Sequence, residues 1–116
     1  MKSKGHNVPA AAKRWMSWVA KQLCVNCGAT GVHVHHCAGA TAKHNKVEIG
    51  DWWILPFCPE CHQDIHGERA RFFYCETRKE TEKLMFDRLM HWAESDSALL
   101  DAPRESVVHA IMDYHR

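Results

Sequence analysis

The chain has 116 residues, 46% of them hydrophobic and five of them tryptophan, which excludes a disordered tail and predicts one folded domain over residues 1–116. The formal net charge is only +1, and no apolar run reaches the roughly 18 residues of a membrane span, so we expect no membrane partner. Residues 1–5 lack the apolar stretch of a secretory signal, and we therefore expect a cytoplasmic location.

The small net charge conceals an uneven distribution. Residues 1–47 contain seven Lys and Arg and no acid, whereas residues 48–116 contain all 14 acids and the other eight bases. A basic N-terminal part favours contact with a polyanion such as DNA; a solvated surface of uneven charge is the structural alternative. The candidate DNA-binding residues are Lys13, Arg14, Lys21, Lys43 and Lys46.

Residues 8–23 are predicted to form a first helix, with Asn7 as its cap and Pro9 near its first turn. One face of this helix is apolar (Trp15, Trp18, Val19 and Leu23), and the opposite face carries Lys13, Arg14 and Lys21. A basic face can lie on DNA, and an ordinary amphipathic core helix is an equal alternative.

A Cys-Val-Asn-Cys-Gly knuckle opens the central part of the chain, and a short strand is predicted over Val32–His36. Residues 37–50 are predicted to be a loop of small and basic residues, either touching a substrate backbone or serving as a plain connection. Residues 51–56 are rich in strand formers and predict a second strand.

A helix is predicted to begin at the second knuckle, with Pro59 at its first position and Glu60 in its first turn, and to run past Gly67 toward Tyr74. Thr77-x2-Glu80 has the pattern of a capping box at the start of a further helix. This helix has an apolar stripe of Met85, Phe86, Leu89, Met90, Trp92 and Ala93, and a last helix after Pro103 has one of Val107, Val108, Ile111 and Met112. Both stripes are predicted to be core-packing or dimer faces.

Two Cys-x2-Cys pairs, separated by 30 residues, carry the strongest chemical signal. Four thiolates from two turns supply the tetrahedral ligand set of a structural zinc, and reduced thiols in the cytoplasm favour metal over disulfides. The predicted ligands are Cys24, Cys27, Cys58 and Cys61, with replacement of one cysteine by His62 as the alternative. The lone Cys37 and Cys75 are interpreted as buried or free thiols.

A second cluster is formed by histidines. His62 and His66 are four residues apart, which places both imidazoles on one helix face. Together with His35 they would give a metal three ligands and leave an open position; surface histidines without a ligand role are the alternative. His36 would then be a general base for phosphodiester hydrolysis. Strand alternation directs His35 and His36 to opposite sides unless the strand ends or bends there, and His33 is expected to be exposed or to orient the site.

The run from His35-His36 through Asp51-Trp-Trp-Ile-Leu-Pro-Phe-Cys58 to Cys61-His62-x3-His66 resembles the HNH endonucleases, most closely the phage-encoded recombination-enhancement nucleases that depend on RecA. The resemblance covers residues 24–74. It implies an α+β protein with a small zinc-stabilised ββα-metal core (24–74), flanked by an N-terminal basic helix (1–23) and C-terminal helices (75–116).

By this resemblance His36 matches the general base, and His35, His62 and His66 match the ligands of a catalytic Zn²⁺, Mg²⁺ or Mn²⁺. The motif's middle Asn, which braces the loop near the base, falls near Trp53, and Asp51 is the nearer chemical substitute. The resemblance implies hydrolysis of DNA in the cytoplasm of a bacterial host, with a recombinase filament as a partner. The alternatives are a non-catalytic zinc-ribbon that binds nucleic acid, and a phage scaffold that forms a homodimer or larger assembly through its C-terminal helices.

Overall fold

The computed structural model describes residues 8–67, 77–96 and 100–114. These residues form a small α+β structure of helices and short antiparallel sheets, which confirms the α+β part of the predicted fold. Its central element is a two-stranded ribbon in which β1 (His33–His36) pairs with β4 (Ile54–Phe57), with His35 opposite Leu55. Within these ranges, no helix is both long and apolar enough to cross a membrane.

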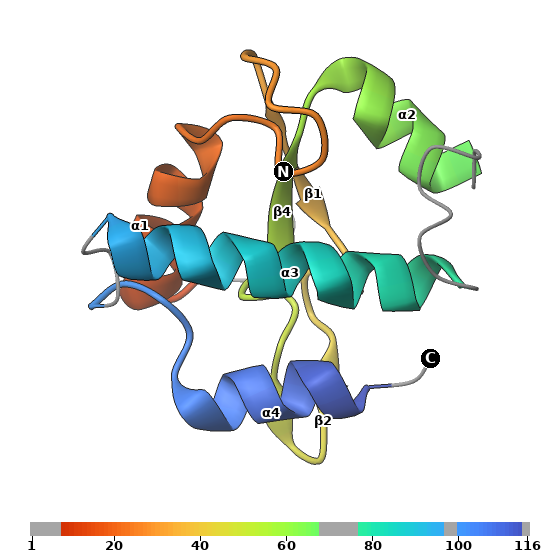
Figure 1. Ribbon diagram of the computed structural model, residues 1–116. Coiled ribbons are helices and arrows are strands. Elements are labelled where there is room, and N and C mark those ends of the chain that lie inside the picture. The colour runs from red at the N-terminus through yellow and green to blue at the C-terminus, as the bar shows by residue number, and fades with distance from the viewer. Residues whose placement is uncertain (1–7, 68–76, 97–99, 115–116) are drawn as a thin grey trace, which may run out of the picture.

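Helices pack around this ribbon (Figure 1). α1 (Ala10–Ala20) contacts both strands, and α2 (Pro59–Gly67) follows β4 directly and contacts both strands as well. α3 (Arg78–Ser95) crosses the ribbon, and α4 (Glu105–Asp113) contacts β3. The shared core contains large side chains from helices α1 to α4 and from β4, together with Trp53 of the preceding turn: Trp15, Trp53, Phe57, Ile65, Phe86 and Ile111.

α1 is shorter than predicted at both ends. It starts at Ala10 with Pro9 at the N-cap and no side-chain cap, and it ends at Ala20 with Lys21 as the C-cap. Asn7 lies outside the described residues. Leu23 was predicted to be on the apolar face of the helix, but it follows the helix end and is 50% exposed. The chain must leave the helix before Cys24 so that the knuckle can form.

The segment 37–50 contains more structure than the predicted loop. β2 (Lys43–His44) and β3 (Val47–Glu48) form a hairpin with Asn45 and Lys46 as the two turn residues. Both turn residues have positive φ, 52° and 67°, which a two-residue hairpin turn matched to the strand twist requires. The predicted loop was therefore wrong, because Asn-Lys is a weak hairpin signal compared with Asn-Gly.

The second strand lies later than predicted, since Asp51 and Trp52 belong to a turn in which the N–H groups of Trp52 and Trp53 both donate to the carbonyl oxygen of Ile49. α2 does begin at Pro59, as predicted. The predicted continuation beyond Gly67 toward Tyr74 falls outside the described residues.

The capping box at the start of α3 is confirmed. Thr77 Oγ1 accepts from the backbone N–H of Glu80 at 3.1 Å, and the Glu80 carboxylate accepts from the backbone N–H of Thr77 at 3.0 Å. Most of the predicted stripe is buried in the core, and Met90 and Trp92 are partly buried against it. α4 likewise buries Val107, Ala110 and Ile111. These faces are therefore core-packing faces.

Replacement of Thr77 by Ala should lower the free energy of unfolding by about 1 kcal/mol and the melting temperature by roughly 4 °C, because the Glu80 N–H loses its capping acceptor. Thr41→Ala, at an exposed turn position, is the matched control. Thermal denaturation followed by circular dichroism measures both. An equal melting temperature for the two variants would contradict the capping role.

Candidate metal centres

The four predicted zinc ligands come together in space. Cys24 and Cys27 come from the loop after α1, whereas Cys58 and Cys61 stand at the junction of β4 and α2. Their sulfurs all lie within 4.8 Å of one another. The two knuckles are joined by the backbone, because the N–H of Val25 donates to the carbonyl oxygen of Pro56 at 2.9 Å. Gly28 takes a φ of 82° directly after Cys27, a conformation that glycine adopts without steric cost.

The sulfur spacing fits a tetrahedral metal. Zinc binds thiolates at about 2.3 Å, which places two sulfurs of one tetrahedron about 3.8 Å apart. Cys27 Sγ and Cys58 Sγ are 3.7 Å apart. In addition, Asn26 Nδ2 donates to Cys61 Sγ at 3.4 Å, and the Cys61 N–H donates to Cys58 Sγ at 3.5 Å. Such donors stabilise thiolates, so the four cysteines can hold a structural metal ion such as zinc.

The thiols respond very differently to their surroundings. Burial raises the pKa of the Cys61 thiol to about 12. Burial also raises that of Cys24, but hydrogen bonds from the backbone of Cys58, Cys27 and Asn26 outweigh it and lower the pKa to about 7. The backbone hydrogen bond from Ala29 lowers the pKa of Cys27, but burial and the sulfurs of Cys58 and Cys24 outweigh it, so that the pKa is raised. Four sulfurs this close therefore need a cation before all can ionise.

His62 does not replace a cysteine in this cluster. It belongs instead to a second group with His35 and His66, whose ligand nitrogens lie within 4.8 Å of one another. His35 comes from β1 and is buried, whereas His62 and His66 lie one turn apart on α2 and reach the surface. The structure thus brings together the three histidines that the sequence grouped.

The nitrogen spacing also fits a metal. Two imidazole nitrogens bound to one tetrahedral zinc at about 2.0–2.1 Å stand about 3.3 Å apart, and His62 Nε2 is 3.2 Å from His66 Nε2. His33 occupies the same side of β1 as His35, and its Nδ1 lies 3.4 Å from His62 Nδ1. His33 is exposed, as expected, yet its ring contacts His62.

The two imidazoles on α2 favour their neutral forms. Burial lowers the pKa of His62 and of His66 below 6.5, and the nearby His35 lowers both further. A neutral imidazole is the form that binds a metal. The lowered pKa values of His62 and His66 therefore favour metal binding.

His36 lies apart from this cluster. It is the last residue of β1, and its Nε2 is 3.3 Å from Asp51 Oδ1. The two residues thus form a histidine–carboxylate pair at the end of the ribbon. Trp53, where the family resemblance places the bracing Asn, is instead fully buried, and its Nε1 has no hydrogen-bond partner among the described residues.

Glu82 of α3 is a site residue that the sequence did not reveal. Its Oε2 is 2.6 Å from His35 Nε2, with both side chains buried. Burial raises the pKa of Glu82, but the His35 hydrogen bond and the charges of Lys79 and Arg78 outweigh it and lower the pKa below its usual value. No sequence signal marked Glu82, because a glutamate beside the apolar stripe of α3 is expected to face solvent.

Cys37 is buried, as predicted, and lies beside His35 and Glu82. Burial raises its pKa well above the usual range, and the Glu82 charge adds to this. Cys37 is therefore a neutral thiol. Cys75 lies outside the described residues.

The five candidate DNA-binding residues are all exposed. Lys13 and Arg14 project from α1, whereas Lys43 and Lys46 belong to the hairpin. Arg14 forms an exposed ion pair with Asp101 at 3.0 Å. Its charge is thus partly neutralised.

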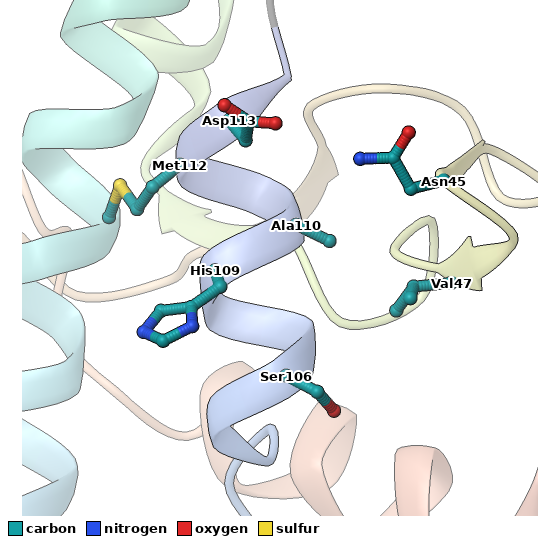
Figure 2. Close-up of a pocket in the computed structure, with 7 residues that line it drawn as sticks. All are labelled: Asn45, Val47, Ser106, His109, Ala110, Met112 and Asp113. Atoms are coloured by element: carbon teal, nitrogen blue, oxygen red, sulfur yellow. The ribbon is translucent and has the colours of Figure 1, made fainter.

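A groove of about 450 Å³ lies between the hairpin and α4. Figure 2 shows Asn45 and Val47 on the hairpin side, with Ala110 facing them from the helix. None of the cysteines and histidines of the two clusters lines it. The groove is therefore separate from the two candidate metal sites.

Fold and site define a small α+β protein with a four-cysteine site able to hold a structural metal. The chain belongs to the family described as "Protein of unknown function (DUF968)", whose model matches residues 4–109. Searches of curated proteins and of solved structures each gave no match.

Replacement of Cys61 by Ser should unfold the core, because a structural zinc contributes on the order of 10 kcal/mol, comparable to the whole stability of a small domain. Cys58→Ser should act alike. Cys37→Ala, which removes a buried sulfur outside the four-cysteine cluster, should keep its zinc. Circular dichroism and metal content measure the outcome; a folded Cys61→Ser protein would exclude the structural role.

NMR titration should give His62 and His66 midpoints below pH 6.5, since a lowered pKa means that the imidazole gains its proton only at lower pH. The experiment uses protein carrying one zinc per chain. His91 is the internal control, because a hydrogen bond to the Asp87 carbonyl and the Asp87 charge raise its pKa. Midpoints for His62 and His66 equal to that of His91 would contradict the described cluster.

Proposed function

We propose that this protein is a metal-dependent endonuclease of the HNH class that hydrolyses DNA phosphodiester bonds. The observation that carries the proposal is the three-imidazole cluster of His35 on β1 with His62 and His66 on α2, the helix that also carries Cys61 of the four-cysteine site. A non-catalytic zinc ribbon that only binds nucleic acid needs the four cysteines and has no need of the histidines. A cluster of three imidazoles that reaches the surface has the ligand number of a catalytic metal site.

In this proposal β1, β4 and α2 form the ββα-metal core, and His35, His62 and His66 hold a divalent metal. Bound there, the metal would polarise the phosphate and stabilise the leaving oxygen. Imidazole ligands suit zinc, and an exchangeable site can also run on Mg²⁺ or Mn²⁺.

His36 is the proposed general base. Its Nε2–H faces Asp51 Oδ1 at 3.3 Å, so that Nδ1 keeps the lone pair that accepts a proton from water. The water oxygen then forms a bond to phosphorus as the bond from phosphorus to the leaving sugar oxygen breaks. Asp51 fixes the ring and stabilises the imidazolium that forms.

The exposed Lys13, Lys21, Lys43 and Lys46, together with Arg14, are proposed to contact the DNA backbone through charge alone. A phage or prophage origin, a role in recombination, a bacterial cytoplasm and a recombinase filament as partner follow from the resemblance to recombination-enhancement nucleases. They belong to the same proposal.

A plasmid-nicking assay with Zn²⁺, Mg²⁺ and Mn²⁺ tests the proposal. His36→Ala should lower the nicking rate by about 10²–10⁴-fold, the usual contribution of a general base, while the protein stays folded and binds metal. His44→Ala is the matched control, because His44 is also partly exposed (26%, against 29% for His36) and also pairs with an aspartate, Asp113 at 3.1 Å. It should nick normally.

Undiminished nicking by His36→Ala would refute the assignment of the base. No nicking by the intact protein with any of the metals, together with retained DNA binding, would favour the non-catalytic zinc-ribbon module instead. Parallel reactions on single-stranded DNA, branched DNA and RNA identify the substrate.

A further inference from the structure

Among the described residues, Glu82 and His35 form a deeply buried polar contact at the edge of the histidine cluster. Their side chains are 0% and 1% exposed, and Glu82 Oε2 lies 2.6 Å from His35 Nε2. The contact joins α3 to β1 across 47 positions of the chain. A buried carboxylate and imidazole this close imply a fixed hydrogen bond, with the imidazole as donor.

The charge of Glu82 is compensated without His35. Arg78 Nε lies 3.3 Å from Oε2, and Lys79 Nζ lies 3.4 Å from Oε1. Two cations therefore face the carboxylate from the same helix, and His35 does not have to be protonated to balance it. A neutral His35 that donates from Nε2 carries its lone pair on Nδ1.

The position of the His35 ring gives that lone pair a direction. The ring centroid is 5.1 Å from that of His62 and 5.1 Å from that of His66, so the His35 ring is equally close to both. Nε2 is engaged by Glu82, which leaves Nδ1 as the nitrogen available to a metal shared with His62 and His66. Histidine ligands commonly donate their other ring N–H to a carboxylate, which fixes tautomer and orientation.

We propose that Glu82 is the positioning residue of the histidine site: its carboxylate accepts the Nε2–H of His35 and so directs Nδ1 toward a divalent metal held with His62 and His66. The inference rests on the proposed function for the metal, and it adds a role for α3 that lies outside the HNH-like segment. The competing explanation is a purely structural contact that docks α3 on the ribbon.

The first test needs no substitution. Long-range ¹H–¹⁵N NMR of protein carrying one zinc per chain should show His35 as the Nε2–H tautomer, and added Cd²⁺ or Zn²⁺ should then shift its Nδ1 resonance. His35 as the Nδ1–H tautomer, or coordination through Nε2, would overturn the proposal.

The second test measures Co²⁺ affinity at the histidine site by visible absorption, with the cysteine site already filled by zinc. Glu82→Ala should weaken Co²⁺ binding by about 10–100-fold, and the isosteric Glu82→Gln, whose side-chain oxygen still accepts from Nε2–H, should weaken it less. Met85→Ala, which truncates a buried side chain of the same helix, is the control for loss of packing and should keep wild-type affinity.

The outcomes separate this inference from the proposed function. Equal Co²⁺ affinity of the wild-type and Glu82→Ala proteins would refute the role of Glu82 and leave the nuclease proposal intact. Weaker binding by Glu82→Ala than by Met85→Ala, in a protein that never nicks DNA, would support Glu82 and refute the nuclease. Absence of any second metal site in the wild-type protein would overturn both. If Glu82→Ala does not fold, the tautomer measurement decides.

Discussion

The convergence of four cysteine sulfurs is the constraint on which the rest of the structure depends. It closes a loop of 30 residues between Cys27 and Cys58. Both strands of the ribbon and the hairpin lie inside that loop, so a metal bound by the four sulfurs would hold the two ends of the loop together. The Val25–Pro56 backbone bond and the Arg88 guanidinium, which donates to the Val25 carbonyl oxygen at 2.8 Å, then dock the first knuckle on β4 and on α3. A chain of this size has a limited apolar core, and a metal held by the four cysteines would supplement it.

The histidine cluster depends on that frame. Cys58 and Cys61 fix the first turn of α2, and one helical turn separates His62 from His66, so the direction of both imidazoles is set when the second knuckle closes. β1 supplies His35 from the opposite side and α3 supplies Glu82. Three elements therefore meet at the His35 imidazole. The buried charge of Glu82 is tolerated because Arg78 and Lys79 lie beside it. The site is built from contacts between elements more than from any single motif.

Local sequence rules account for much of this arrangement. The Cys-x2-Cys spacing gave both knuckles, Pro59 marked the start of α2, and Thr77 with Glu80 marked the start of α3. The same rules failed where a local signal was weak: the hairpin at Asn45 and Lys46 lacks glycine, and the strand formers Trp52 and Trp53 enter a turn because both of their N–H groups bond to Ile49. Leu23 shows the same limit, since helical periodicity takes no account of the knuckle that follows.

The sequence by itself determined which residues can bind metal, because ligand type and short-range spacing are local properties: four cysteines in two pairs, and two histidines one helical turn apart. Only the tertiary structure decided which partners surround these groups. It placed His35 against His62 and His66 and placed His36 against Asp51, and it brought in Glu82 from 47 residues away. Strand alternation already directs His35 and His36 to opposite sides. The buried partner of His35, however, comes from the docking of α3, which no local pattern encodes.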